Sequence, residues 1–297
     1  MKKGGPPKKE RRTNMATFFN RATLSYTGGV VNSNVTRGEI LTPISVTKTA
    51  TVDEYNGDSQ ITFAVNIINA GSIAVDGITV NDDLGQYQLD TVTYQPLDYV
   101  DGSLKYFVNG VLQPEPAVLT DNGLQISGIA IPADGNVALL YTTLINGFAP
   151  LEAGSQIENN LTLDGSCGEG IAATEIISVA EEINLDITKS LCPTTVTCDG
   201  NVNYTLEILN YGNRETVATD NLIVTDVFNP PFENITVTYN GAAWTQPDDY
   251  VYDPVSGVFQ TVLGAITVPA ASFERDAESG EIITTPGKAT IVINGNL

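Results

Sequence analysis

The sequence predicts an all-β chain organised as two tandem domains. Three observations lead to this fold class: the composition, short apolar alternations between turns, and an internal repeat. The 297 residues suffice for about two domains of ordinary size, and 42% of them are apolar, which is enough for each domain to bury a core. Thr, Val, Ile, Asn and Gly are abundant, and no long stretch repeats apolar residues every 3.6 positions, so strands joined by turns are expected.

The internal repeat appears when the chain is aligned with itself. "ISVTKTATV" at position 44 matches "LDITKSLCPTTV" at 185, and "ITFAVNIINAGS" at 61 matches "VNYTLEILNYGN" at 202. "ITVNDDLG" at 78 then matches "LIVTDVFN" at 222, and "IPADGNVALLYTTLING" at 131 matches "TTPGKATIVING" at 284. Modules of about 110 to 120 residues, with short alternating strands and Gly, Asn, Asp and Pro turns, describe immunoglobulin-like β-sandwiches.

Only the first copy of the repeat continues into a closing strand. "AGSQIENNLTL" at 153 closes the first domain, whereas the second copy ends at Leu297 without an equivalent, so the second sandwich is expected to lack its last strand. A relative of the closing strand, "FFNRATLSYTGG" at 18, precedes the first domain, where there is no earlier domain for it to close. We therefore expect this segment to be a donor strand, with one face formed by Phe18, Asn20, Ala22, Leu24 and Tyr26.

The repeat also sets the expected domain boundaries. The first fourteen residues hold six of the fourteen Lys and Arg residues together with paired Gly and Pro, which is typical of a disordered basic arm. The expected parts are a disordered basic arm (1–15), a donor strand and connector (16–43), a first Ig-like domain (44–166), a linker (167–182) and an incomplete second Ig-like domain (183–297).

Two lysines occupy the same inward-facing position of the repeat. Outside the basic arm the chain has only four lysines, and strand alternation places Lys48 on the face of Ile44 and Val46. Lys189 shares a face with Ile187 in the same way. An unpaired buried ammonium group costs several kcal/mol, so we expect each lysine to have a partner that neutralises or consumes its charge.

Inward-facing acids and amides recur at matched positions. Asp82 lies on the face of the apolar residues before it, as does Asp226 in the second copy, while Asn159 faces inward on the closing strand and Asn20 on its relative. Lys, Asp and Asn in this arrangement predict a spontaneous isopeptide bond, because desolvation favours the neutral amine and the protonated acid. We expect Lys48 to join Asn159 within the first domain, assisted by Asp82. Lys189 is expected to join Asn20 of another subunit, assisted by Asp226.

The same residues have ordinary structural explanations, which depend on the strand register. A lysine at a strand end commonly extends to the rim of the sheet, an Asp beside a turn commonly caps a loop, and an inward Asn commonly bonds to backbone. A slip of one residue in register would turn all of these side chains outward.

The sequence motifs resemble a known family. "VTKTATV…VNIINAGSIAVDGITVNDDLG" and "ITKSLCPTTV…LEILNYGNRETVATDNLIVTDVF" resemble the conserved-repeat domain of unknown function, an Ig-like module found in tandem on bacterial surface proteins, from residue 16 onward. A two-module chain opening with "ATFFNRATLSYTG" also resembles the fibre subunits of spore appendages from anaerobic spore-forming bacteria. The resemblance implies a structural protein of a cell or spore surface, with assembly in the mother cell.

Several classes of function are disfavoured by the composition. The net charge of −21 would repel nucleic acid and anionic membranes, and no histidine is available as a general base or metal ligand. No secretory leader, membrane span, metal site or cofactor is expected, and the acidic loops "NDD" at 81 and "QPDDYVYD" at 246 lack the ligand spacing of a calcium loop. Cys192 and Cys198 either form a disulfide or remain free thiols, and Cys167 is left over.

The sequence therefore predicts a structural subunit of an extracellular or spore-surface fibre rather than an enzyme. Its expected partners are identical subunits arranged head-to-tail, together with a separate anchoring or tip protein. The competing interpretation is a passive cell-surface adhesin or carbohydrate-binding module, which would call for a leader, an anchor and an aromatic patch; Trp244 is the single tryptophan.

Overall fold

The chain folds almost entirely into β-strands, which confirms the predicted all-β class. The structure is a computed structural model that describes residues 15–41, 43–165, 170–197 and 200–297. The basic arm up to residue 14 lies outside the described residues. Among those described, the one helical element is a short 3₁₀ turn, η1 (Ala218–Asp220), and no helix is long and apolar enough to cross a membrane. The described residues divide into two compact units, one within 15–51, 60–144 and 158–175 and the other within 52–59, 145–157 and 176–297.

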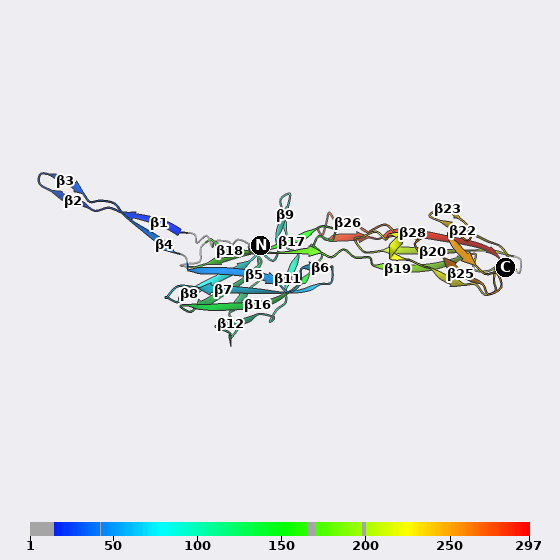
Figure 1. Cartoon of the computed structure of the whole chain (residues 1–297), viewed down its shortest axis with the longest axis horizontal. Helices are drawn as coiled ribbons and strands as arrows, with labels where there is room; N and C mark the ends of the chain where they lie inside the picture. Colours follow the sequence, from blue (N-terminus) through cyan, green and yellow to red (C-terminus); the bar gives the residue numbers. More distant parts are fainter. Residues whose placement is uncertain (1–14, 42, 166–169, 198–199) are drawn as a thin grey trace, which may run out of the picture. The chain divides into compact units, whose positions relative to one another are not determined.

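An N-terminal β-hairpin precedes the first sandwich (Figure 1, blue). Its outer part is formed by β2 paired antiparallel with β3, and its base by β1 paired antiparallel with β4. The strands pair with one another and with no other described strand. The bounds are β1 (Met15–Asn20), β2 (Thr23–Tyr26), β3 (Gly29–Asn32) and β4 (Thr36–Leu41). We call this hairpin, residues 15–41, the arm.

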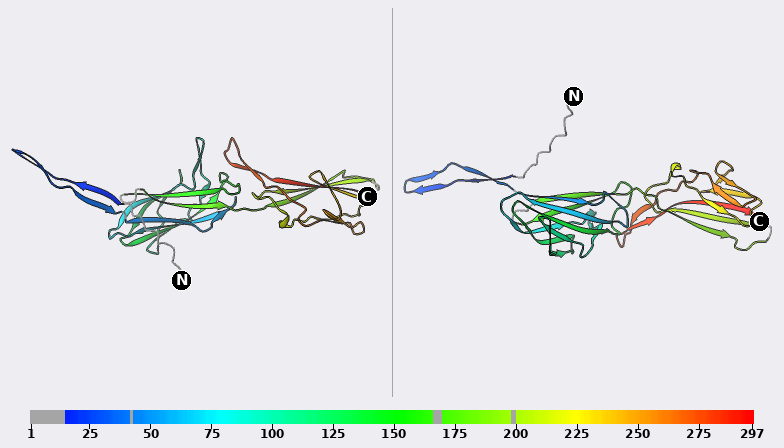
Figure 2. Two further views of the ribbon diagram at one scale, coloured as in Figure 1. Left: turned by 45° about the horizontal axis from the view of Figure 1, so that its top comes forward. Right: turned by 60° about the horizontal axis from the view of Figure 1, so that its bottom comes forward.

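The first sandwich consists of two sheets (Figure 2). One has the strand order β13-β12-β16-β7-β5, with β11 also paired to β16. Its strands are β5 (Ile44–Ala50), β7 (Gln60–Asn69), β11 (Leu97–Tyr99), β12 (Lys105–Val108), β13 (Val111–Gln113) and β16 (Gly135–Ile145). The other sheet has the order β14-β15-β8-β17-β18-β6. Its strands are β6 (Glu54–Tyr55), β8 (Val75–Asp82), β14 (Ala117–Leu119), β15 (Leu124–Ile131), β17 (Gln156–Asp164) and β18 (Ile171–Val179). A small hairpin joins β9 (Tyr87–Leu89) to β10 (Val92–Tyr94).

Alternation along these strands builds the core of the first sandwich. In β7 every second residue from Ile61 onward is buried, as expected for a strand with one face against a second sheet. The same alternation runs through β16 and β17. The closing strand β17 lies beside β8, with Leu161 opposite Asp82 and Leu163 opposite Val80, so it covers one edge of β8 while β15 covers the other.

The second sandwich has one sheet of five strands and a smaller sheet of three. The larger has the order β19-β20-β28-β22-β23 and the smaller has the order β21-β25-β24, while β26 pairs with β27. The strands are β19 (Leu185–Cys192), β20 (Asn201–Asn210), β21 (Thr225–Val227), β22 (Ile235–Tyr239), β23 (Ala242–Trp244), β24 (Tyr250–Tyr252), β25 (Val258–Thr261), β26 (Ser272–Arg275), β27 (Ile282–Thr285) and β28 (Gly287–Asn296).

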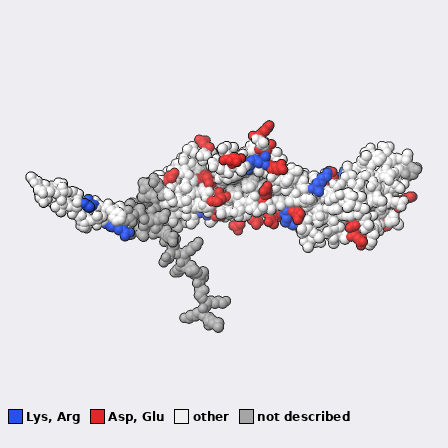
Figure 3. All heavy atoms as spheres, turned by 90° about the horizontal axis from the view of Figure 1, so that it is seen from above, with Lys and Arg blue, Asp and Glu red and all other residues white. Residues whose placement is uncertain are grey.

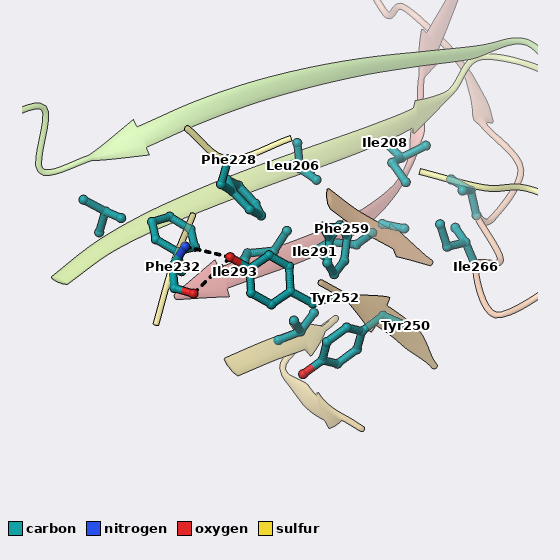
Figure 4. Close-up of a cluster of buried hydrophobic side chains, with 14 residues drawn as sticks. Leu206, Ile208, Phe228, Phe232, Tyr250, Tyr252, Phe259, Ile266, Ile291 and Ile293 are labelled. Atoms are coloured by element: carbon teal, nitrogen blue, oxygen red, sulfur yellow. Dashed lines mark hydrogen bonds between the residues drawn. The ribbon is translucent and has the colours of Figure 1, made fainter. Parts of the chain in front are cut away.

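The core of the second sandwich is rich in aromatic rings (Figure 4). Phe228 and Phe232 lie 4.6 Å apart between ring centroids, and Phe259 is fully buried beside them. The Tyr252 hydroxyl accepts a hydrogen bond from the Phe232 amide at 2.6 Å and donates one to the Phe232 carbonyl at 3.1 Å. This core holds the domain together although its smaller sheet is incomplete.

The incompleteness is visible in the strand orders. In the first sandwich β8 lies between β15 and β17, whereas its counterpart in the second sandwich, β21, has β25 on one side and no strand of the described chain on the other. The prediction that the second sandwich lacks its last strand is confirmed for the described residues.

Two features of the architecture differ from the sequence-based expectations. The segment expected to be a single donor strand with a connector, residues 16–43, forms a two-stranded hairpin over residues 15–41. The segment expected to be a linker, residues 167–182, contains β18, which follows β17 and lies next to it in the sheet. In both places the second strand is less regularly apolar than the first, so sequence alternation alone did not reveal it.

Candidate functional site

Lys48 and Asp82 form an ion pair in the interior of the first sandwich. Lys48 comes from β5 and Asp82 from the end of β8, so the pair bridges the two sheets. The Lys48 Nζ lies 2.6 Å from the Asp82 Oδ2, and the side chains are 0% and 1% exposed. Two further donors serve this carboxylate: the Leu84 amide donates to its Oδ1 at 3.0 Å, and the Tyr141 hydroxyl donates to its Oδ2.

Asn159 of β17 completes this site. The Lys48 Nζ donates to the backbone carbonyl of Asn159 at 3.2 Å. The side-chain oxygen of Asn159 accepts a hydrogen bond from the Gly85 amide at 3.2 Å. Its side-chain nitrogen, Nδ2, is buried and has no hydrogen-bond partner in the described part of the chain. A buried polar atom without a partner is rare in folded proteins and calls for a functional or energetic explanation.

Burial sets the electrostatics of this site. Desolvation lowers the pKa of Lys48, although the neighbouring Asp82 carboxylate opposes the shift. The ring of Phe63 lies 4.9 Å from the Lys48 Nζ and stacks on the ring of Tyr141. Desolvation, reinforced by the negative charge of Asp82, raises the pKa of Tyr141 well above its usual value, so this hydroxyl remains a proton donor. A lysine whose pKa is lowered more readily supplies the neutral amine that can act as a nucleophile.

The arrangement has the parts needed to convert an amine and a carboxamide into a new amide. The Gly85 amide polarises the side-chain carbonyl of Asn159, and would stabilise the negative charge that develops on its oxygen. Attack by the Lys48 Nζ on the Asn159 Cγ would form a C–N bond, break the bond from Cγ to Nδ2 and release ammonia. The Asp82 carboxylate, which accepts a hydrogen bond from the Tyr141 hydroxyl, lies 2.6 Å from the amine that must lose a proton.

The second sandwich repeats the pair in a more open setting. The Lys189 Nζ of β19 lies 2.5 Å from the Asp226 Oδ2 of β21, yet the two side chains are 38% and 16% exposed. The ring of Tyr204 lies 4.3 Å from the Lys189 Nζ and the ring of Phe228 lies 5.3 Å from it. Lys189 was predicted to face inward, and it does meet Asp226, but it is not sealed from water, because no described strand takes the place of β17.

Strand register shows that the two sites are built alike but not identically. Lys48 lies opposite Val65 of β7, and Lys189 lies opposite Leu206 of β20. Phe63 and Tyr204, two residues before these partners, therefore occupy equivalent positions. The same comparison on the next strand matches Tyr141 with Ile293. The second site therefore has a tyrosine beneath the lysine and an aliphatic residue where the first site has its hydroxyl donor.

The missing strand leaves an apolar groove in the second sandwich. The groove is lined by β19, β20 and the segment leading into β21. Three of its apolar side chains are substantially exposed: Leu185 (40%), Ile187 (50%) and Ile223 (44%). Leu185 matches Ile44 of the first sandwich, which is buried at 5%, and Ile187 and Ile223 match Val46 and Thr79, which are half-buried. An exposed apolar surface of this kind marks a binding site or a site at risk of aggregation.

The arm carries an apolar surface of its own. Figure 3 shows it mostly white, without the acidic patches that gather over the first sandwich. Its most exposed large side chains are Phe18 (53%), Phe19 (66%), Leu24 (66%), Tyr26 (61%), Val30 (63%), Val31 (54%) and Val35 (55%). Asn20 and Ala22 are exposed as well, so none of the predicted donor-strand side chains is buried in the subunit.

The remaining sequence-based expectations concern the cysteines and metal binding. Cys192 is exposed and forms no disulfide with a described residue, while its predicted partner Cys198 and the third cysteine, Cys167, lie outside the described residues, so the disulfide stays a prediction. Among the residues that the structure describes, no three acidic, Cys or His side chains are grouped to hold a metal ion. Tyr141 and Gly85 are site residues that the sequence did not predict. The alternation of "VALLYTTL" indicates that Tyr141 faces the core, but nothing in the sequence shows which carboxylate it meets.

Comparison with known proteins gives a likeness to solved structures alone. No family model and no curated protein matches the chain, so the resemblance to the conserved-repeat module stays a prediction. The major pilin subunit BcpA of Bacillus cereus is 11% identical, with 91% of this chain and 73% of that chain covered and a TM-score of 0.34. The full-length pilus protein RrgB of Streptococcus pneumoniae is 10% identical, with 91% and 45% covered and a TM-score of 0.35. A collagen-binding domain from a Staphylococcus aureus adhesin is 16% identical, with 46% and 96% covered and a TM-score of 0.29.

Proposed function

We propose that this chain is a structural subunit that assembles head-to-tail into an extracellular or spore-surface fibre. The arm of one subunit fills the groove of the second sandwich of the next. The observation that carries the proposal is the contrast between the two Lys–Asp pairs. The pair closed by β17 is fully buried, and the same Lys–Asp pair on the corresponding strands of the second sandwich remains open.

The sequence of the arm supports it as the missing strand. Asn20 aligns with Asn159 of β17. Phe18, Ala22 and Leu24 alternate with the same phase as Asn20, just as the buried residues of β17 alternate with the same phase as Asn159. Asn20 precedes Lys48 by 28 positions and Asn159 precedes Lys189 by 30, so each closing strand stands at nearly the same distance before a domain. Each sandwich would then be completed by the segment that precedes the following sandwich.

The energetics favour this contact. A sheet edge with unpaired N–H and C=O groups readily accepts an added strand. Burying a large apolar side chain such as Phe18, Leu24 or Tyr26 contributes about 1.5 to 3 kcal/mol each. The donor and the groove are different surfaces of one chain, so each contact leaves one subunit with a free arm and the other with a free groove. Further subunits can therefore add at both ends, and the contact propagates into a filament.

Covalent locking follows from the same geometry. Within a subunit, Lys48 and Asn159 form an isopeptide bond with Asp82 assisting. Between subunits, Lys189 bonds to Asn20 of the neighbour with Asp226 assisting. The buried, unpartnered Nδ2 of Asn159 supports this proposal, because the reaction removes that atom as ammonia and relieves its desolvation cost.

The internal bond should be visible in the mass of the intact protein. We expect the folded wild-type chain to weigh one ammonia less than its sequence predicts. Asn159→Ala, which keeps the Lys48–Asp82 pair, should restore the calculated mass. The bond would close a loop of roughly 110 residues, so by analogy with a disulfide its loss should lower the free energy of unfolding by about 4 to 5 kcal/mol. A wild-type chain of unmodified mass would refute the internal bond.

The polarity of assembly is tested by mixing two defective subunits. Leu24→Glu places a charge on the exposed inner face of the arm, and Ile187→Glu places one on the exposed floor of the groove. Both residues are solvent-exposed in the free subunit, so folding should be little affected. Each variant alone should be monomeric by light scattering, because one lacks a working donor and the other a working groove.

The mixture of the two should form heterodimers and nothing longer, because one intact arm and one intact groove remain. Ser25→Glu, on the opposite face of the arm, and Val251→Glu, at an exposed position on β24, serve as matched controls and should form filaments. Filaments formed by Leu24→Glu or Ile187→Glu alone would contradict donor-strand assembly.

A further inference from the structure

We infer that the donated element is the complete β-hairpin of residues 15–41, which enters the neighbouring subunit as a preformed two-stranded unit. The inference rests on the proposed head-to-tail assembly and specifies what is transferred. The first strand of the arm, β1 with β2, would pair with β21, and the second strand, β3 with β4, would extend the sheet beyond it.

The first sandwich supplies the template for this arrangement. Its β8 is followed in the sheet by β17 and then by β18, so two strands are present where the second sandwich has none in its described residues. The second of these strands contributes to the site: the Glu175 Oε1 of β18 accepts a hydrogen bond from the Ala50 amide of β5 at 2.9 Å. The negative charge of Glu175 also opposes the lowering of the Lys48 pKa by burial. A single donated strand would leave the second sandwich without an equivalent of β18.

The arm has the same spacing as this template. Side-chain hydrogen bonds join Asn160 to Thr174 and Gln156 to Ser178, a register that brings Glu175 opposite Asn159. In the arm, Asn20 lies opposite Thr36. The separation along the chain is 16 residues in both cases, so the arm positions a second strand relative to Asn20 as β18 is positioned relative to Asn159.

Packing within the arm indicates that its strands remain together. The ring of Phe18 covers Gly38 on the opposite strand so closely that a Cβ added at Gly38 would lie 2.2 Å from the ring. The two strands are joined further by the Ser33 amide, which donates to the Ala22 carbonyl at 2.9 Å, and by the Thr36 hydroxyl, which donates to the Asn20 carbonyl at 3.2 Å. Entry of the first strand alone would break these contacts.

The template also fixes the register of docking. Because Leu161 lies opposite Asp82 and Leu163 opposite Val80, we expect Ala22 to lie opposite Asp226 of the acceptor and Leu24 opposite Val224. In this register Asn20 faces Lys189 as Asn159 faces Lys48. The other face of the arm, which includes Thr23 and Asn32, is expected to remain exposed. Thr162, the residue of β17 that matches Thr23, is exposed in the same way.

A disulfide across the arm separates the two modes of entry. Thr23 and Asn32 lie directly opposite each other, and the Thr23 hydroxyl donates to the Asn32 side-chain oxygen at 2.8 Å, so T23C/N32C places two cysteines within bridging range on the exposed face. We expect the oxidised double variant to polymerise within about twofold of the rate of its reduced form, followed by light scattering, because the locked hairpin enters unchanged. The single variants T23C and N32C, treated identically, control for the native cysteines.

Polymerisation that occurs only after reduction would overturn the inference, because the first strand would then have to leave the second before entering the groove. Failure of the underlying assembly has a different signature. If donor-strand assembly itself is wrong, Leu24→Glu subunits polymerise as the wild type does, whatever the state of the engineered disulfide.

Discussion

Replacement of Lys189 by methionine should convert fibres that survive hot detergent into fibres that fall apart into single subunits. Methionine keeps the unbranched apolar stem but removes the amine, so the arm can dock and no bond to Asn20 can form. We expect the wild-type protein to give a ladder of multimers on a denaturing gel and Lys189→Met to give only the monomer band. Removal of the lysine also leaves Asp226 unpaired, but this carboxylate is partly solvated, so the fold should tolerate the change.

The matched control is Lys288→Met. Lys288 lies in the same sandwich and forms an ion pair with Glu207 in which both side chains are largely exposed, so its loss should leave the ladder intact. Mass spectrometry of a digested wild-type fibre should find the Lys189 peptide joined to the Asn20 peptide. A wild-type fibre that dissolves completely in hot detergent would rule out the covalent link and leave donor-strand docking untouched.

Deletion of residues 1–41 should abolish assembly and leave soluble monomers. The arm pairs with no described strand of either sandwich, so its removal takes no described strand from their sheets. The groove loses the only donor that we propose for it, together with the exposed apolar side chains of the arm. Electron microscopy and size-exclusion chromatography of protein stored at high concentration would measure the effect, with filaments expected for the full chain.

Deletion of residues 1–14 is the control, because it removes the basic segment and retains the hairpin. This shorter deletion should form filaments as the full chain does. Filaments of ordinary morphology from the chain lacking residues 1–41 would show that the arm is not the donor, and would require a groove partner from elsewhere.

Much of the candidate site could be predicted from the sequence. The alternation of "ISVTKTA" and "ITVNDD" gave the inward direction of Lys48 and Asp82, because side chains in a strand alternate between faces with a period of two. The internal repeat carried the same assignment to Lys189 and Asp226. The structure places each lysine within 2.6 Å of the expected acid.

Other parts of the site could not be predicted from the sequence. The hydroxyl of Tyr141 and the amide of Gly85 meet Asp82 and Asn159 across long sequence separations, and pairing between distant segments leaves little local signal. The second strand of the arm was missed for a related reason. In residues 29–41 the apolar positions are interrupted by Asn, Ser, Arg and Glu, a pattern that is also typical of a connector.

By itself, the sequence determined the all-β class, the two repeats and the inward faces of Lys48, Asp82 and Asn159, because these follow from local alternation and from comparison of the chain with itself. Only the tertiary structure decided that Lys48 is sealed from water while Lys189 is not. Burial depends on which strands lie beside one another. Two sites with the same Lys–Asp pair therefore differ in exposure because β17 covers the edge of β8 and no described strand covers the edge of β21.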